Sequence, residues 1–337
     1  MSARAGRFVR GDRSGGGGVF VTCPTCSASL RFLLHYDAKT APGVAVDHRG
    51  RGFATVPNAF PLPVGPVEAG GSCPGVTAAC RDCYAAGLEL RGPAFRNGAA
   101  ANLANLHHLY GCGSRRGGVD RVTAALVAVV RQSERLQRAD GVAAPCFRWH
   151  SSGDVFASWY AVAMRRTMAA TAGVEHWGYT RSLGLVRHLD GLPSSARFYI
   201  SADRYNLTVA GRVAARYGWP VALLADDETD AAALWARLAG SVPGAVAARP
   251  VLCPVVGKWA DGRGVSSFVV GPDGRRSSVR PGGPGVGACV ACGVCLPGGP
   301  SRPVTFTVHG GRARGDSVGR LGAAVAVRLR AREAVTV

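Results

Sequence analysis

A repeated alternation of apolar segments and helical patterns constrains the fold of this chain more than any other feature. Strand-like segments occur at 145–150, 176–179, 197–200, 220–224 and 246–252. Each of the first four is followed by a polar turn and a helical pattern. A strand followed by a helix, recurring about every 25 residues, is typical of a parallel α/β fold. We therefore predict an α/β fold with a parallel sheet over about residues 71–254.

Each predicted strand ends in small polar or charged residues. These are Ser152, Asp154, Thr180, Arg181, Ser201, Asp203 and Asp226. In parallel folds the carboxyl ends of the strands face the ligand, so we expect these side chains to converge on one surface. The same residue types also serve as helix N-caps, and for each single residue that alternative stays open.

The strand at 145–150 ends in His150, which shares one face of the strand with Arg148. We interpret His150 either as part of an amphipathic strand or as a residue that lines the site beside Ser152 and Asp154. Helical patterns also precede this strand, at 76–90, 97–110 and 120–138. In the last of these Asp120 is expected to be the N-cap.

The remaining segments differ in composition. We predict a flexible basic tail at 1–18, an α/β metal-binding domain at 19–256, a Gly/Cys-rich cluster segment at 257–300 and a basic C-terminal segment at 301–337. The first of these lacks the apolar core of a secretory signal, and no run of about 18 apolar residues exists. We therefore expect a cytoplasmic protein, with no membrane span, whose eleven cysteines favour metal over disulfides.

Three cysteines, Cys73, Cys80 and Cys83, form the first group (the edge thiols). Two residues separate Cys80 from Cys83, so both thiolates can point into one space, and a Pro-Gly turn follows Cys73. Three thiolates leave the fourth position of a cube-shaped iron–sulfur cluster open to a small molecule. A three-cysteine zinc site usually recruits a histidine, for which His107 and His108 are the nearest downstream candidates.

The second group is Cys289, Cys292 and Cys295, spaced by two residues each, as in bacterial ferredoxins. Cys253 is the natural fourth ligand, and we call these four the C-terminal thiols. Four thiolates close the coordination shell, which indicates a structural or electron-conducting site. Zinc is the alternative. The pair Cys23-x2-Cys26 is a weaker signal, interpreted as half a zinc knuckle or a redox pair.

The charge of the chain is strongly positive. Forty Lys and Arg residues against 21 Asp and Glu give a formal net charge of +19. Such an excess indicates a polyanionic partner such as nucleic acid, although part of it can serve solubility alone. No P-loop, G-x-S-x-G or H-E-x-x-H motif is present, so the corresponding nucleotide-binding and hydrolytic classes are excluded.

Taken in order, four motifs resemble the phage gene product 88 family. They are Ser72-Cys73-Pro74-Gly75 with Cys80-x2-Cys83-Tyr84-Ala85, then Phe147 to Asp154, then Tyr179-Thr180-Arg181-Ser182, and finally Cys289-x2-Cys292-x2-Cys295. The match runs from about Asn58 to Leu296. The family belongs to phages and related mobile elements, and the resemblance implies that this chain does too.

The cysteine–tyrosine motif is also similar, more remotely, to that of radical S-adenosylmethionine enzymes. That resemblance implies a partial (β/α) barrel in which the edge thiols ligate a [4Fe-4S] cluster whose open iron binds S-adenosylmethionine. It implies cofactor contacts at Tyr84, Ser152, Gly153 and Asp154. In this chain six residues separate Cys73 from Cys80 where those enzymes have three, and Tyr84 follows the third cysteine. A non-enzymatic, zinc-stabilised nucleic-acid-binding protein is the alternative function.

Overall fold

The computed structural model describes residues 17–37, 44–46, 52–54, 56–244, 248–253, 269–270, 286–287, 289 and 292–307. The predicted basic tail up to residue 16, most of the Gly/Cys-rich segment and the C-terminal segment from residue 308 lie outside this part. Among the described helices, none combines the length and apolar character needed to cross a membrane.

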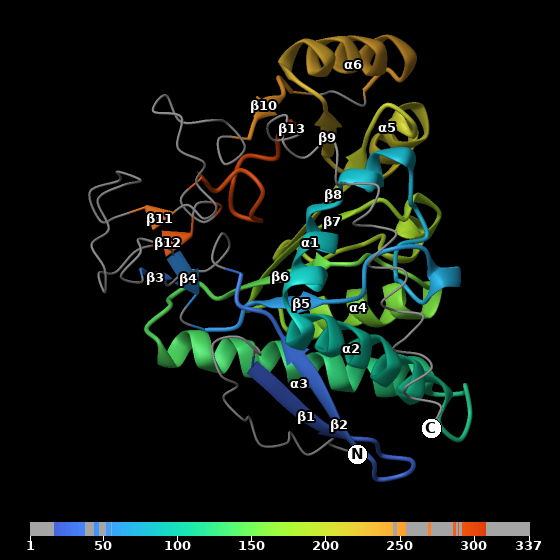
Figure 1. Cartoon of the computed structure of the whole chain (residues 1–337), viewed down its shortest axis with the longest axis vertical. Coiled ribbons are helices and arrows are strands. Elements are labelled where there is room, and N and C mark those ends of the chain that lie inside the picture. The colour runs from blue at the N-terminus through green and yellow to red at the C-terminus, as the bar shows by residue number, and fades with distance from the viewer. Residues whose placement is uncertain are drawn as a thin grey trace.

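A seven-stranded sheet, in the order β10-β13-β9-β8-β7-β6-β5, organises the molecule (Figure 1). Its strands are β5 (Ala59–Pro61), β6 (Cys146–Ser152), β7 (Glu175–Thr180), β8 (Ala196–Ala202), β9 (Val221–Ala225), β10 (Val251–Leu252) and β13 (Val304–Thr307). All neighbouring pairs are parallel. The predicted α/β fold with a parallel sheet is therefore confirmed. The sheet extends beyond the predicted range at both ends, because β5 precedes residue 71 and β13 follows residue 254.

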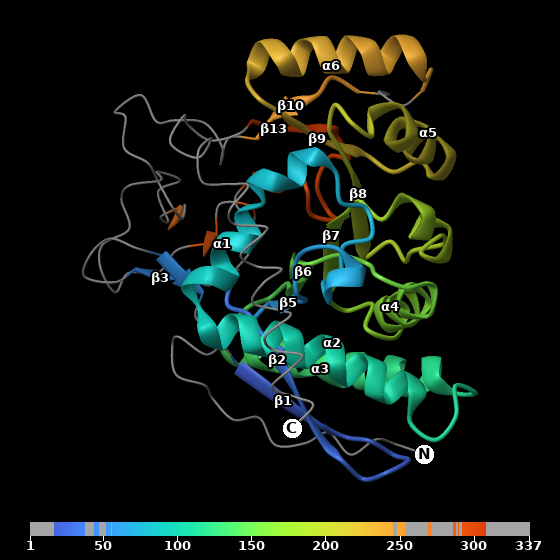
Figure 2. The same ribbon diagram turned by 45° about the vertical axis from the view of Figure 1, so that its right-hand side comes forward.

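Helices cover one face of this sheet. They are α4 (Ser158–Ala170), α5 (Leu207–Tyr217), α6 (Glu228–Ser241) and the 3-10 helix η4 (Leu183–His188). Figure 2 shows α4, α5 and α6 along the outer side of the curved sheet. Phe198 and Ile200 of β8 are buried toward this helical layer. Tyr199, between them in the strand, points to the opposite face, as the period of two in a strand requires.

The opposite face of the sheet is covered by the end of the described chain. Tyr199 and Val304 form a buried cluster there, against which Tyr179, Val294 and Phe306 pack. The segment 292–297, which carries two of the C-terminal thiols, therefore lies on the face of the sheet that the helices leave open.

The remaining elements precede β6 in the chain or follow β10. They are the hairpin β1 (Gly17–Thr22) and β2 (Ser29–Leu34), helices α1 (Tyr84–Arg91), α2 (Pro93–Gly111) and α3 (Gly118–Ala139), the 3-10 helices η2 (Val67–Ala69) and η3 (Ala78–Asp82), and two short antiparallel pairs, β3 (Val44–Val46) with β4 (Gly52–Ala54) and β11 (Val269–Val270) with β12 (Val286–Gly287). Helix α2 lies against β2 and α3.

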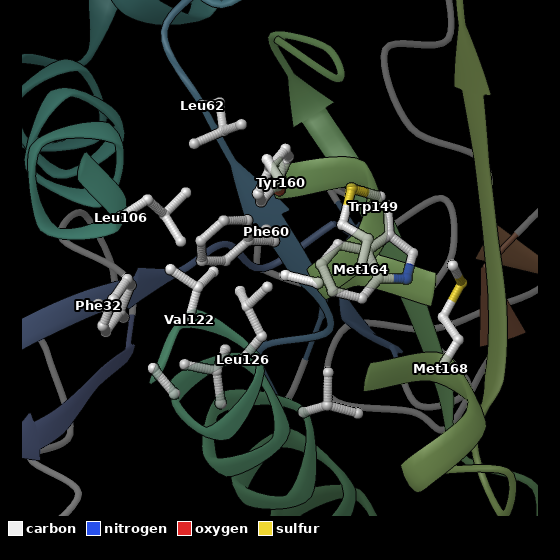
Figure 3. Packing of buried hydrophobic residues seen from close by; sticks show 14 of the residues in the cluster. Phe32, Phe60, Leu62, Leu106, Val122, Leu126, Trp149, Tyr160, Met164 and Met168 are labelled. Carbon is white, nitrogen blue, oxygen red and sulfur yellow. The ribbon is translucent and has the colours of Figure 1, made fainter. Parts of the chain in front are cut away.

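One apolar core joins the hairpin, α2, α3, α4 and the sheet (Figure 3). Phe32, Phe60, Leu126 and Trp149 are buried in it. Asn102 of α2 is buried beside this core, where it bonds to the backbone of both neighbouring strands. Its Oδ1 accepts from Leu33 N at 2.7 Å, and its Nδ2 donates to Leu33 O at 3.0 Å and to Pro61 O at 2.9 Å. One amide therefore fixes α2 against β2 and β5.

The predicted capping role of Asp120 is wrong. Helix α3 begins two residues earlier than expected, and its N-cap is Gly117, whose φ of 75° is left-handed. Asp120 lies in the first turn instead. Its carboxylate pairs with Arg166 of α4 at 2.6 Å, so it links the two helices on the surface.

Candidate metal centres

The loop that follows β5 turns back onto the end of β6. Leu62 N donates to Ser152 O at 2.9 Å, and Ser152 Oγ donates to Leu62 O at 2.7 Å. Ser72, at the end of the loop, donates to Pro63 O at 2.8 Å and accepts from Asp154 N at 3.1 Å. The residue that precedes the first edge thiol is thereby fixed to the carboxyl end of β6.

The Asp154 carboxylate joins the ends of β6 and β7. Its Oδ1 accepts from Thr180 Oγ1 at 2.7 Å and from Val155 N at 2.7 Å, while Oδ2 accepts from Arg181 N at 2.8 Å. Burial raises the pKa of Asp154, although the hydrogen bonds from Arg181 and Thr180 act in the opposite direction. Both carboxylate oxygens are therefore engaged within the protein, and Asp154 shapes the edge of the sheet.

A second junction joins the edge-thiol loop to the ends of β7 and β8. Thr77 Oγ1 donates to Asp203 Oδ2 at 2.7 Å and accepts from Arg181 Nη1 at 2.9 Å, and Arg181 forms an ion pair with Asp203. A Cβ on Gly75 would lie 2.1 Å from Arg181 O, so the loop can approach β7 this closely only through a glycine. The carboxyl ends of three neighbouring strands, β6, β7 and β8, thus hold the loop in place.

The edge thiols lie near one another at this junction. Burial raises the pKa of Cys73, and the nearby Asp154, Cys83 and Cys80 raise it further. Burial also raises the pKa of Cys83, against the effect of the N–H groups of Ala86 and Ala85 at the start of α1. Cys80 Sγ accepts from Thr77 N at 3.4 Å. Cys73 therefore lies near Asp154 and the other two thiols, and the surroundings of Cys73 and Cys83 favour their protonated form.

The other predicted cofactor residues flank this junction. His150 is buried in β6 with a left-handed φ of 57°. Its Nε2 lies 3.1 Å from Tyr160 Oη on α4, which places the ring toward the helical face. Gly153 has a φ of 77°, and a Cβ there would lie 2.3 Å from Ser72 Oγ. The side chain of Tyr84 lies outside the described residues.

Of the other predicted strand-end residues, Ser201 and Asp226 take no part in this junction. The backbone oxygen of Ser201 accepts from Asn206 Nδ2 at 3.1 Å. Asp226 pairs with Arg204 at 2.6 Å on the surface. The neighbouring Asp227 is the N-cap of α6, whose side chain accepts from Asp230 N. At this strand the helix-cap interpretation therefore applies to the adjacent residue.

The C-terminal thiols lie on the face of the sheet that is opposite helices α4, α5 and α6. Strand β8 holds their segment, because Arg197 donates to Leu296 O at 2.6 Å and to Pro297 O at 2.7 Å. Burial raises the pKa of Cys295, while hydrogen bonds with Tyr179 and Tyr199 act to lower it.

Two further C-terminal thiols lie close to Cys295. Burial raises the pKa of Cys289, and the charges of Asp37, Cys253 and Cys295 raise it further. Cys253 N donates to Thr305 O at 2.9 Å, which fixes that thiol beside β13. The fourth member, Cys292, is exposed.

A third group is gathered more tightly than either of these. It consists of Cys23, Cys26, His108 and Cys112, whose ligand atoms all lie within 4.8 Å of one another. Across the described residues, no other set of three or more His, Cys, Asp or Glu side chains meets that criterion for a single ion. This Cys3His group could bind a metal ion.

Sequence reasoning did not find this group as a site. It interpreted Cys23 and Cys26 as half a zinc knuckle or a redox pair, and it named His107 and His108 as candidates for the edge thiols. His108 instead lies beside Cys26, with Nε2 3.3 Å from Sγ, although the two residues are 82 positions apart. His107 packs against Trp159. The available signal was the spacing of His108 and Cys112, four residues apart and thus on one helix face.

Comparison with known proteins gives one match. A family model described as gene product 88 matches residues 32–297 of the chain. No curated protein and no solved structure matches it. The matched span contains the edge thiols, the C-terminal thiols, His108 and Cys112, and it begins after Cys23 and Cys26.

Proposed function

The chain belongs to the gene product 88 family, and we propose that it is a metalloprotein with an iron–sulfur cluster on the edge thiols. The observation that carries this proposal is the seating of their loop on the carboxyl ends of β6, β7 and β8, through Asp154, Arg181 and Asp203. This edge is where parallel α/β proteins place their ligands.

The spacing of the edge thiols is compatible with a cluster. They are near enough for Cys80 and Cys83 to influence Cys73, yet they are not gathered into the shell of one ion. In a cube-shaped cluster each thiolate binds its own iron, so the sulfur atoms stand farther apart than around one zinc ion. Three ligands would leave one iron without a protein thiolate.

In the finer form of the proposal, S-adenosylmethionine binds at this open iron and the chain is a radical enzyme. The bound cofactor would supply one-electron chemistry. Ser152 and Asp154 then hold the loop in place, because their side chains are already bonded to Leu62, Thr180 and Arg181. His150, two residues before Ser152 in β6, is buried and has a left-handed φ of 57°, and such strained backbone clusters at functional sites.

The C-terminal thiols are proposed to hold a second, closed centre on the face of the sheet opposite the helices. Three of them influence one another, and Tyr179 and Tyr199 bond to Cys295. A four-thiolate centre there would be structural or electron-conducting.

Anaerobic purification followed by iron, sulfide and zinc analysis tests the cluster. The proposal expects iron and sulfide in the wild type and the loss of one cluster's share of both from the Cys73→Ser/Cys80→Ser/Cys83→Ser variant, in which the C-terminal thiols are intact. Cys112→Ser, which leaves both proposed clusters intact, is the control and should retain iron. A colourless protein that holds only zinc would refute the iron–sulfur proposal.

If iron is present, addition of S-adenosylmethionine and dithionite tests the radical step. Formation of 5′-deoxyadenosine is expected from the wild type and not from the triple serine variant. An intact cluster that yields no 5′-deoxyadenosine would rule out the radical enzyme and leave a binding or electron-transfer role.

The second candidate function is a non-enzymatic, zinc-stabilised nucleic-acid-binding protein. The Cys3His group favours it, since these ligands suit zinc, and so does the net charge of +19. Under either function we propose a nucleic acid partner. Binding should weaken steeply with salt, because neutralised phosphates release their counterions. Retention on DNA that does not change with salt concentration would contradict this partner.

A further inference from the structure

We infer that Cys23, Cys26, His108 and Cys112 form a structural zinc site that fastens the β1–β2 hairpin to the C-terminal end of α2. The site shares no residue with the edge thiols or the C-terminal thiols. It is therefore independent of the iron–sulfur proposal, and each can fail without the other.

The hairpin turn has the backbone geometry of a metal-binding knuckle. Cys23 and Cys26 lie in the turn between β1 and β2, which is closed by Cys23 N to Ala28 O at 2.8 Å and Ser27 N to Cys23 O at 2.9 Å. Ser27 takes a left-handed φ of 61°, which turns the chain sharply after the second cysteine. The N–H groups of Cys26 and Thr25 point at the Cys23 sulfur. Such donors stabilise a thiolate, the form that binds metal.

Helix α2 supplies the other two ligands from one face. Cys112 N donates to His108 O at 2.8 Å, which continues the helical hydrogen bonding by one residue and places both side chains one turn apart. The chain then turns at Gly113, with a φ of 71°. A Cβ there would lie 2.7 Å from Thr25 Cγ2. The absence of a side chain at Gly113 lets the knuckle approach the helix end closely.

The distances fit a single tetrahedral ion. Zinc–sulfur bonds of about 2.3 Å place the ligand atoms of a tetrahedron about 3.8 Å apart. All four ligand atoms already lie within 4.8 Å of one another, and Cys26 Sγ lies 3.3 Å from His108 Nε2. A filled site therefore requires side-chain adjustments of about an ångström or less.

The ligand set selects zinc and a structural role. Three thiolates and one imidazole suit zinc among the available divalent ions. Four protein ligands leave no position for water or substrate, so the site is closed. Only Cys23 is buried, while Cys26 is exposed. We therefore expect a chelator to reach the ion.

The β1–β2 hairpin needs additional support, because it is not part of a larger sheet among the described residues. A two-stranded hairpin is marginally stable by itself in water. Here β1 and β2 bury Val19, Val21 and Phe32 against the helices, but they pair with no other strand of the described sheets. A zinc ion between the hairpin turn and α2 would link the hairpin tip to the helix from which its partner Asn102 also projects.

Two histidine variants of the full chain test this site. His108→Asn should lose one zinc per chain by elemental analysis. The neighbouring His107→Asn, on the same helix but packed against Trp159, should retain it. The triple serine variant of the edge thiols should also retain this zinc, which separates the site from the iron–sulfur proposal. Full zinc content in His108→Asn, or equal loss from His107→Asn, would overturn the inference.

Cobalt substitution of the wild type keeps the test valid if a variant fails to fold. Chelation followed by Co²⁺ addition should give the intense visible bands of a tetrahedral cobalt–thiolate site, and Zn²⁺ should bleach them. Hydrogen exchange of the metal-free chain should speed up in residues 17–34 and 108–113 and stay unchanged in β6 to β9. A spectrum with only the pale bands of octahedral cobalt would refute the tetrahedral site. Hydrogen exchange that is the same with and without zinc would refute the fastening role.

Discussion

The folding stability at low pH tests the burial of two histidines, His176 in β7 and His150 in β6. His176 is completely buried, and both of its ring nitrogens are engaged. Its Nδ1 accepts from Trp149 Nε1 at 3.3 Å, and its Nε2 lies 2.9 Å from Thr171 Oγ1. Protonation of Nδ1 would direct a second N–H against that of Trp149. Burial lowers the pKa of His176 to about 4 and that of His150 to about 3, from an ordinary 6.5.

The sign of the effect follows from these values. Below pH 6.5 the unfolded chain binds a proton at each histidine, whereas the folded chain binds none until the pH approaches 4. Folding stability therefore falls as the pH falls through this window. Between pH 7 and pH 5 the loss amounts to about 2 kcal/mol for each histidine, or about 4 kcal/mol for the two.

Urea unfolding at pH 7 and pH 5 measures this loss. The wild type should be less stable at pH 5, and His176→Gln should show a difference between the two pH values that is smaller by about 2 kcal/mol. Gln137→Ala is the control, because it removes bonds to Cys146 at a residue that does not titrate. It should lower stability equally at both pH values. A His176→Gln variant with the full wild-type difference would refute the reasoning.

Four further pairs of substitutions have defined outcomes. Gly153→Ala should cost more unfolding free energy than Gly141→Ala, because both have positive φ but only the Cβ at 153 meets Ser72 Oγ, at 2.3 Å; thermal unfolding gives the difference, expected to exceed ~1 kcal/mol. Asn102→Ala should destabilise by about 2–3 kcal/mol in urea, because it leaves buried backbone groups without partners. Asn105→Ala should cost less than about 1 kcal/mol, because Asn105 is only half-buried and bonds to the backbone of the exposed Arg31. Ser27→Gly should keep its zinc, whereas Ser27→Val should weaken zinc binding at least tenfold in a chelator competition, since a β-branched residue resists left-handed φ. Asp154→Asn should lose iron during anaerobic purification, whereas Asp226→Asn, on the surface, should retain it; equal iron contents would contradict the role given to Asp154.

The alternation of strands and helices made most of the sheet predictable. Strands β6 to β9 are local apolar segments, and α4, α5 and α6 follow them directly, so short-range patterns were sufficient. Strand β13 was not predictable in the same way. Its four residues follow a Gly/Pro-rich stretch, and its place between β9 and β10 depends on contacts with residues far away in the sequence.

The same distinction between local patterns and long-range contacts applies to the candidate sites. Parallel strands bring their carboxyl ends together, so the gathering of Asp154, Arg181 and Asp203 could be expected from their positions. Their partners could not, because the contact of Asp203 with Thr77 joins residues 126 positions apart. The Cys3His group was missed for the same reason. Each half has a recognisable spacing, but only the packing of the hairpin on α2 joins Cys26 to His108.

The position of β13 between β9 and β10 determines when the sheet can be completed during synthesis. Strands β5 to β9 are available once residue 225 has emerged, but β10 has no neighbour in the sheet other than β13. The edge of β9 therefore stays open until residues 304–307 arrive, and an open edge invites pairing with other chains. Since Arg197 and Tyr199 hold the segment just before β13 through the backbone of Leu296 and Val294, closing the sheet and placing Cys295 against it become a single late folding event. A chain that ends before residue 304 would lose β10 together with β13.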